Sequence, residues 1–252
     1  MGGVERGRPR VSVVIPVHDE GPRLNACLDR ILEAVTLPCE VLVVYDTPDD
    51  RTVPHLQRYA ACDRRVRPVH NTRGRGPANA IRSGFDEARA PVVVVTMADG
   101  SDDAMQIDTL TRLVERGVVI AAASRYSRAG QQVGAPPLKA VLSRLAGLTL
   151  FHAARVGTHD ATNSFKAYSA EFIRCAGVES DQGFEIGIEL VAKARRARLP
   201  IAEIPTIWLE RSQGTSNFRI AAWSRHYLRW YLYAFGPRRP LEGFVPGPIA
   251  TR

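Results

Sequence analysis

PVVVVTMADGSDD, residues 91–103, is the stretch that decides the fold. Its four consecutive valines predict a strand buried on both faces, as strands in the middle of a parallel sheet are. The strand runs directly into Asp99, Asp102 and Asp103. The carboxyl ends of such strands are where open α/β sheets bind ligands. Carboxylate oxygens there suit a hard divalent cation that arrives with substrate phosphates.

A second role is open to the acidic residues at the end of this stretch. Asp102 or Asp103 can N-cap a helix that begins near Ala104. Capping and ligand binding are compatible, so both remain open at this point.

Strands and helices alternate along the first half of the chain. Apolar runs predict strands, and apolar residues at helical spacing predict the helices between them. The expected strands span residues 11–17, 41–45, 66–69, 91–95 and 118–123, and the expected helices span 24–35, 54–61 and 78–88. This alternation predicts an α/β fold with a mostly parallel central sheet and helices on both faces.

Acidic residues follow three of the early strands, at Asp19-Glu20, Asp46 and Asp99. Parallel strands bring all of these ends to one edge of the sheet, which indicates a site. The turn Gly74-Arg75-Gly76 before a helix could cradle a phosphate on backbone N–H groups, although a simple loop explains it equally well.

The second half of the chain is predicted in less detail. We expect a loop at residues 128–137 and a helix that contains Ser143-Arg144. Strands are expected at 160–168 and 201–208, with a helix at 184–198 between them. A loop at 210–217 then leads to an aromatic helix.

Composition limits the classes of protein. The chain has 252 residues and a net charge of +8, which suits one α/β domain with a phosphate-bearing partner. A nucleic-acid-binding protein is an alternative, but no recognition motif is present and the arginines are scattered. The four cysteines show no metal-ligand spacing and are expected as free thiols in a reducing compartment. No signal peptide and no membrane-spanning run is evident, so we expect a cytoplasmic protein.

The order of motifs resembles that of the inverting family 2 glycosyltransferases with an A-type fold, and within them the polyprenyl-phosphate or dolichol-phosphate sugar synthases. VVIPVHDE (13–20) is similar to the family's VVIPxxNE, VYDTPDDRT (44–52) to VDDGSxDGT, and residues 71–84 to NxGxgxAxxxG. ASRY (123–126), SR (143–144), DATNSFKAY (160–168), EIP (203–205) and RSQGTS (211–216) match later motifs. The resemblance covers residues 11–218.

Several positions depart from the family pattern. The family's DADxQ metal motif begins with a carboxylate where this chain has Met97. Either Asp99 and Asp102 share the cation, or metal binding is weakened. Ser164, Lys166 and Asn217 also replace a glycine, an arginine and a lysine.

The resemblance implies a role for each matched residue. The donor, a nucleotide-diphospho-sugar such as GDP-mannose or UDP-glucose, is expected at Pro16, Asp19, Glu20, Asp46, Gly74, Gly76 and Asp99. A Mg²⁺ or Mn²⁺ ion is expected on Asp99 and Asp102. The residues expected to act in transfer are Asp99, Arg125, Arg144 and Arg211. The acceptor is expected at Ser124, Arg125, Arg144, Asn163, Glu185 and Ser216.

Two acceptors and one non-catalytic alternative stay open. A polyprenyl phosphate is expected from the resemblance; a soluble molecule, glycan or protein would instead need a base, for which Glu185 or Asp181 is placed before a helix. A non-catalytic relative is the third possibility, because of Met97.

The expected domains are a disordered N-terminus (1–10), a glycosyltransferase domain (11–217), an amphipathic aromatic helix (218–236) and a flexible tail (237–252). The aromatic helix either covers the core or lies at a membrane surface, with Arg225 and Arg229 facing anionic lipid. In the second case the protein is a peripheral one on the cytoplasmic face of a membrane.

Overall fold

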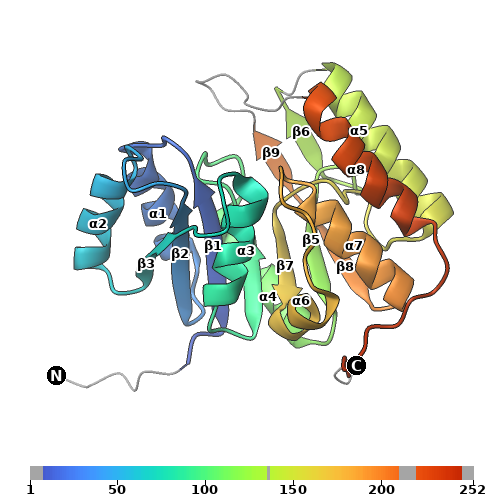
Figure 1. Cartoon of the computed structure of the whole chain (residues 1–252), viewed down its shortest axis with the longest axis horizontal. Helices are drawn as coiled ribbons and strands as arrows, with labels where there is room; N and C mark the ends of the chain where they lie inside the picture. Colours follow the sequence, from blue (N-terminus) through green and yellow to red (C-terminus); the bar gives the residue numbers. More distant parts are fainter. Residues whose placement is uncertain (1–7, 135–136, 210–219, 246–252) are drawn as a thin grey trace.

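A seven-stranded sheet runs through the molecule (Figure 1). The computed structural model describes residues 8–134, 137–209 and 220–245. The strands lie in the order β3-β2-β1-β4-β7-β5-β8, and all except β7 share one direction. They are β1 (Val11–Val17), β2 (Cys39–Tyr45), β3 (Val66–His70), β4 (Val92–Val95), β5 (Ile120–Ser124), β7 (Lys166–Ser169) and β8 (Ile201–Pro205). The prediction of a mostly parallel α/β sheet is confirmed.

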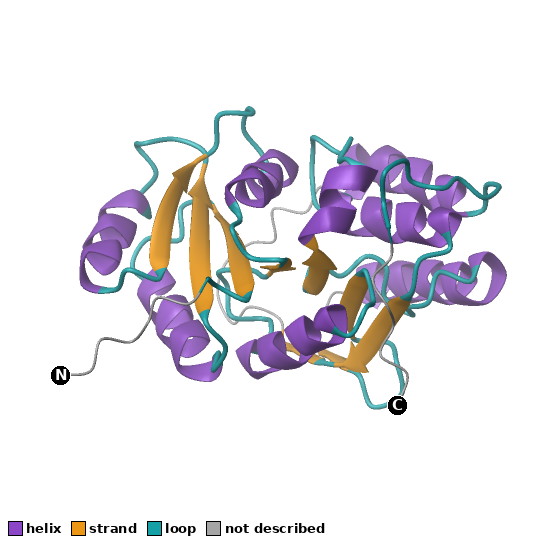
Figure 2. Cartoon of the chain, turned by 90° about the horizontal axis from the view of Figure 1, so that it is seen from below, coloured by secondary structure: helices purple, strands orange, loops and turns teal. Residues whose placement is uncertain are grey.

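Helices cover both faces of this sheet (Figure 2). They are α1 (Arg23–Ala34), α2 (Val53–Cys62), α3 (Pro77–Glu87), α4 (Ile107–Glu115), α5 (Pro137–Thr149), α6 (Ala170–Ala176), α7 (Ile186–Ala197) and α8 (Ile220–Ala234). Val93 and Val95 pack in one core cluster with α3, α6, α7 and α8, whereas Val92 and Val94 pack in the other with α1, α2 and α4. Both faces of β4 are therefore buried, as the run of valines predicted.

The helix α3 lies unusually close to the sheet because of one glycine. A Cβ atom on Gly84 would come within 2.3 Å of a methyl group of Val14 in β1. Any larger residue at this position would push α3 away from β1, and with it the loop that precedes α3 at the edge of the sheet.

Two strands of the second half differ from the prediction. The strand expected at 160–168 begins only at Lys166 and runs antiparallel to both of its neighbours, β4 and β5. The strand expected at 201–208 ends at Pro205, which has no N–H group to continue a ladder. The chain then forms β9 (Ile207–Leu209), which pairs with β6 (Gln131–Val133) in a small parallel sheet.

The described ends of the chain contact the folded domain. Arg10, in the segment expected to be disordered, lies 2.6 Å from Glu115 in an ion pair. Arg239 donates its backbone N–H to Arg196 at 2.8 Å, and Phe244 packs edge-on against Phe172. Arg239 and Phe244 of the expected flexible tail therefore contact the domain, while residues 246–252 lie outside the described part.

Within the residues that the structure describes, no helix is both long enough and apolar enough to cross a membrane. The α8 helix has fifteen residues and carries two arginines, Arg225 and Arg229.

Candidate active site

The ends of β1, β2, β4 and β5 meet at one edge of the sheet, as the sequence predicted. This follows from their parallel directions, because β1 pairs with β2 and β4, and β5 runs the same way across β7. Charged side chains follow these four strands within a few residues. The small β6–β9 sheet lies above this edge in Figure 1.

Asp46, after β2, holds the glycine-rich loop in place. Its Oδ1 accepts a hydrogen bond from Asn71 Nδ2 at 2.7 Å, and its Oδ2 accepts one from the Gly76 N–H at 2.9 Å. Gly76 has a φ of 120°, which only glycine adopts without strain, and it precedes α3 directly. Because Asp46 uses the Gly76 N–H, this amide is not available as the phosphate cradle that the sequence suggested.

Asp19 and Glu20, after β1, line a separate hollow of about 440 Å³ with Arg23, Arg51 and His55. The Asp19 backbone N–H donates to the buried Asp50 at 3.0 Å, which ties this loop to the start of α2. The Arg51 guanidinium lowers the pKa of the Asp19 carboxyl below its ordinary value.

Asp99 and Asp102 lie in one turn after β4. Asp99 Oδ1 accepts hydrogen bonds from the Ser101 N–H at 3.0 Å and the Ser101 hydroxyl at 2.6 Å. Asp102 Oδ2 accepts from the Met97 N–H at 3.1 Å and from the Thr96 hydroxyl at 2.9 Å. Asp102 therefore brings a carboxylate to the backbone of Met97, the residue that stands where the family has its first acidic residue.

The capping role belongs to Asp103, whose carboxylate accepts the Met105 N–H at the start of the short 3-10 helix Ala104–Gln106. Burial raises the pKa of the Asp102 carboxyl to about 6, and the negative charge of nearby Asp99 adds to this shift. Among the described residues, no three His, Cys, Asp or Glu side chains form a ready metal cage. Two neighbouring carboxylates can supply part of the ligand set of a divalent cation, and substrate phosphates can supply the rest.

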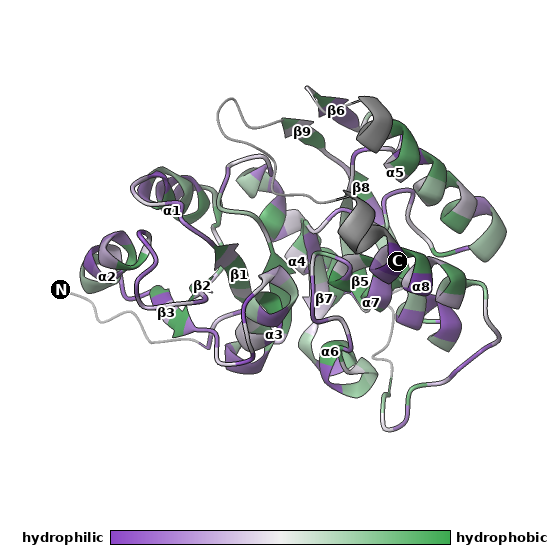
Figure 3. Cartoon of the chain, turned by 45° about the horizontal axis from the view of Figure 1, so that its top comes forward, coloured by the Kyte–Doolittle hydropathy of each residue, from purple (hydrophilic) through white to green (hydrophobic). Residues whose placement is uncertain are grey.

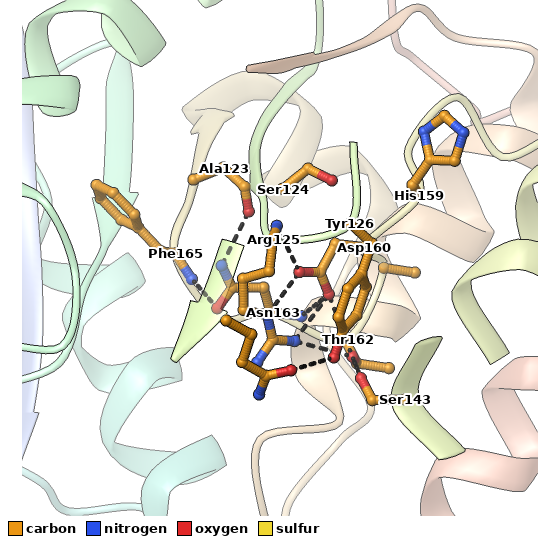
Figure 4. Close-up of polar contacts among 12 residues, drawn as sticks. Ala123, Ser124, Arg125, Tyr126, Ser143, His159, Asp160, Thr162, Asn163 and Phe165 are labelled. Carbon is orange, nitrogen blue, oxygen red and sulfur yellow. Dashed lines mark hydrogen bonds and ion pairs between the residues drawn. The ribbon is translucent and has the colours of Figure 1, made fainter. Parts of the chain in front are cut away.

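Arg125, directly after β5, forms a buried ion pair with Asp160 (Figure 4). Its Nε lies 2.7 Å from Asp160 Oδ2 and its Nη2 lies 2.8 Å from Oδ1, and its backbone N–H also donates to this carboxylate. The Arg125 side chain is 10% exposed and the Asp160 side chain is fully buried. Burial pushes the pKa of Asp160 upward, but the guanidinium outweighs it and holds the pKa below its ordinary value.

A buried amine lies beside this pair. The Lys166 amine, at the start of β7, donates to the backbone carbonyls of Ala161 and Asn163. Burial lowers the pKa of this amine to about 7, although the charge of Asp160 opposes the shift. The end of β5 thus contains Arg125, Asp160 and Lys166 in a space closed to solvent.

The fold agrees with that of known proteins that the chain resembles. Residues 12–177 match the sequence profile of the family described as Glycosyl transferase family 2. The chain belongs to glycosyl transferase family 2.

Two curated relatives of this family 2 member cover most of it. It is 30% identical to the polyprenol monophosphomannose synthase of Mycolicibacterium smegmatis, over 86% of this chain and 88% of that protein. It is 29% identical to the dolichol-phosphate mannosyltransferase of Pyrococcus furiosus, over 87% of this chain but 63% of that longer protein.

Solved structures of a Mycobacterium tuberculosis glycosyltransferase share the fold. Glucosyl-3-phosphoglycerate synthase, crystallised with Mn²⁺, UDP and phosphoglyceric acid, superposes with a TM-score of 0.68 over 92% of this chain and 80% of that one. The sequence identity of 16% makes this a likeness of fold. The predicted A-type glycosyltransferase fold is confirmed.

Three residues expected to bind the acceptor in this glycosyltransferase are instead engaged inside the protein. Ser124 is fully buried and accepts the Ser127 N–H at 3.0 Å. Asn163 donates to the Ala123 carbonyl at 2.8 Å, and the buried Glu185 accepts the N–H groups of Gln182 and Gly183. Their side-chain bonds shape the loops around the site.

The remaining predicted residues have different positions. Arg144 lies exposed on α5, and its positive charge acts on the Tyr126 hydroxyl. Pro16 is half-buried within β1, next to Val44 of β2. Arg211 and Ser216 lie outside the described residues.

Sequence reasoning did not find Asp160, Lys166 or Tyr227 as parts of this region. Tyr227 projects from α8, and the charges of Glu185 and Arg125 both act on its hydroxyl, while burial raises its pKa above the ordinary value. Asp160 and Lys166 lie within the matched DATNSFKAY segment, so the motif itself was the available signal.

The aromatic face of α8 covers the core in part. Trp230 is 2% exposed and donates its indole N–H to Ser180 at 3.0 Å, and Arg229 pairs with Glu179. Trp230 therefore faces the core, whereas the Arg229–Glu179 pair lies at the surface, with the Arg229 side chain 60% exposed. A different set of apolar side chains on α5 and α8 is exposed, and we call it the α5–α8 apolar surface. Figure 3, coloured by hydropathy, shows hydrophobic residues along both of these helices. Its members are Val141, Leu142, Leu145, Leu148, Leu228, Leu232 and Phe235.

Proposed function

We propose that this family 2 glycosyltransferase moves a sugar from a nucleotide-diphospho-sugar to the phosphate group of a polyprenyl phosphate. The choice of a polyprenyl phosphate as the acceptor is supported by the 30% identity to a polyprenol monophosphomannose synthase, which extends over 86% of this chain. The names of both relatives above favour mannose as the sugar, so GDP-mannose is the first donor to test and UDP-glucose the second.

The carboxylates after β4 would hold the divalent cation. The charge of Asp99 acts on Asp102, so the two side chains lie close together, and each is fixed by hydrogen bonds within its own turn. Mg²⁺ and Mn²⁺ are commonly held by one or two carboxylates together with substrate phosphates. When bound, the cation would neutralise negative charge on the departing diphosphate.

The acceptor chemistry needs little proton transfer. An oxygen of the acceptor phosphate forms a bond to the anomeric carbon of the sugar, while the bond from that carbon to the diphosphate breaks and the nucleoside diphosphate leaves. The acceptor phosphate is already anionic at neutral pH, so the enzyme has to position it rather than deprotonate it. This favours an exposed cation over a buried base.

Arg144 is our candidate for that cation. It is exposed on α5, next to Tyr126, whereas Arg125 is committed to Asp160. A guanidinium can hold a phosphate through two parallel hydrogen bonds. Arg125 is then a positioning residue, which fixes the loop after β5 beneath the acceptor.

The α5–α8 apolar surface suits an acceptor that is dissolved in a membrane. Leu142, Leu145, Leu228 and Leu232 are each at least half exposed. Grouped exposed apolar side chains of this kind mark interaction surfaces. We propose that this surface rests on the cytoplasmic face of the membrane as a peripheral contact, which would bring α5 and Arg144 near lipid-borne phosphate.

A transfer assay tests the proposal. The full chain is incubated with labelled GDP-mannose or UDP-glucose and with a polyprenyl phosphate, in the presence of Mn²⁺, Mg²⁺ or EDTA, and the label in the organic phase is counted. The matched control acceptor is the same polyprenol without its phosphate. We expect label in the organic phase only with the phosphate and a divalent cation.

Label transferred to a soluble phosphorylated acceptor and not to the lipid would contradict the proposed acceptor. The membrane contact is tested separately by flotation with phosphatidylcholine vesicles. Leu228→Ser/Leu232→Ser should weaken flotation, and Met105→Ser, which alters an apolar side chain that is 69% exposed elsewhere, should not.

A further inference from the structure

A cavity of about 620 Å³ lies at the opposite edge of the sheet from the active site. Its wall includes Ile201, the first residue of β8, whereas the active-site edge is at Pro205 and Ser124. The remaining lining comes from the C-terminal end of α7, the turn after the π-helical segment Leu150–Ala154, and the chain that follows α8. These elements lie at the lower right in Figure 1.

Five arginines line this cavity, and no acidic residue is among its lining residues. The five are Arg155, Arg195, Arg196, Arg198 and Arg238. In the described part of the chain none of them forms an ion pair, whereas Arg67, for example, pairs with both Glu40 and Glu87. Grouped like charges repel each other, so this arrangement is favourable when an anion completes it.

The inner two arginines are held in place by backbone carbonyls. Arg195 donates to the carbonyls of Ala154 at 2.6 Å and Gly236 at 2.7 Å, and Arg196 donates to the carbonyl of Pro237 at 2.8 Å. These bonds use two of the five N–H donors of Arg195 and one of the five of Arg196. A Cβ atom on Gly236 would lie 2.9 Å from the Arg196 guanidinium, so a larger residue there would displace the end of this side chain.

The favourable interaction of cations with helix C-termini explains only part of this cluster. It accounts for Arg195, Arg196 and Arg198 at the end of α7. It does not account for Arg238, which comes from the segment after α8 and faces the same cavity. Arg155 and Arg198 also adopt left-handed φ angles of 58° and 59°, which glycine or asparagine would adopt at lower cost.

We propose that this cavity is a second anion site, which binds a ligand that carries two or more phosphate groups. Guanidinium groups match phosphate oxygens bidentately, and five of them exceed what a single phosphate can use. The volume is that of a small-molecule site, and Val156, Leu199 and Ile201 add an apolar wall for the organic part. The ligand is either a soluble polyphosphate or a diphosphate lipid headgroup, and the inference does not depend on the proposed acceptor.

Calorimetric titration with inorganic tripolyphosphate tests this site. EDTA is present to remove divalent cations, so that tripolyphosphate cannot bind to a metal ion in the donor site. The main variant is Arg155→Ala/Arg198→Ala/Arg238→Ala, since these three side chains make no hydrogen bond within the described residues. The control is Arg64→Ala/Arg112→Ala/Arg116→Ala, three exposed arginines elsewhere whose loss changes the net charge equally. A second variant, Arg238→Glu, alters only the exposed segment after α8.

We expect the main variant and Arg238→Glu to lose about tenfold or more in affinity, because one charge-assisted hydrogen bond has that value. The control should change by less than about twofold. A parallel arm measures flotation with phosphatidylcholine vesicles with and without cardiolipin. If the main variant loses flotation with cardiolipin vesicles but its affinity for tripolyphosphate does not change, the ligand is a lipid headgroup, and this result also supports the site. Binding in neither arm, or equal loss in the main and control variants, would overturn it.

Discussion

The ends of β4 and β5 lie at the same edge of one sheet and both bear charged residues, but their charges have different surroundings. After β4, Asp99 and Asp102 are half-buried and accept hydrogen bonds from neighbouring backbone and hydroxyl groups. After β5, Arg125 is paired with the fully buried Asp160. The comparison teaches that a residue in a matched motif can serve the fold rather than the substrate, and that burial and pairing distinguish the two roles.

The largest effect is expected from breaking the buried pair. Asp160→Ala leaves the Arg125 guanidinium without its carboxylate in a space closed to solvent, so the free energy of unfolding should fall by about 3–5 kcal/mol. Denaturant unfolding measures this. Arg125→Met/Asp160→Leu should recover most of the loss, and Asp86→Ala, which breaks the exposed pair with Arg73, should cost less than about 1 kcal/mol. A small effect of Asp160→Ala would show that the end of β5 is not structural.

The next effect is expected on catalysis alone. Asp99→Ala should reduce transfer by about a hundredfold or more, because metal-assisted charge neutralisation is worth several kcal/mol. Its melting temperature should stay near that of the wild type, since Asp99 bonds Ser101 within its own turn. Transfer rates and thermal melting check both statements. Near-normal transfer that still requires metal would remove Asp99 from the site.

A smaller effect is expected at Arg144. Arg144→Ala should raise the KM for the phosphate acceptor about tenfold, which corresponds to one charge-assisted contact, and leave the KM for the donor unchanged. Arg144→Lys keeps the charge but cannot make two parallel hydrogen bonds to a phosphate. Its KM for the acceptor should therefore lie between those of the wild type and Arg144→Ala. If the donor KM rises instead, Arg144 belongs to the diphosphate site.

A further effect concerns pH and the buried amine of Lys166. Burial lowers its pKa from 10.5 to about 7, so between these values the unfolded chain binds a proton that the folded chain does not. Stability contributed by this group therefore rises with pH above about 7. Denaturant unfolding from about pH 7 to about pH 9 should show the rise in the wild type and its loss in Lys166→Met. The same slope in both proteins would contradict the buried, neutral amine.

The first half of the molecule was largely predictable, because local pattern determines it. Four valines specify a strand buried on both faces, and strand direction then places Asp46 and Asp99 at one edge. The cluster around Arg125 was not predictable, because Asp160 lies 35 residues away and reaches it only through the antiparallel placement of β7. No periodicity reveals such a partner. The exposure of Leu228 and the burial of Trp230 on one helix also depend on what packs beside α8.

Because β7 runs against its neighbours, the chain leaves the sheet at Ser124 and returns to it at Lys166 on the same edge. The residues between, which include β6, α5 and the segment leading to Asp160, form an excursion whose two ends lie side by side. An excursion of this kind can be lengthened, shortened or exchanged with little effect on strand register, since closing a longer loop adds little entropy cost. Changes within this one excursion would therefore alter what lies beyond the ends of β5 and β7 while the sheet keeps its register.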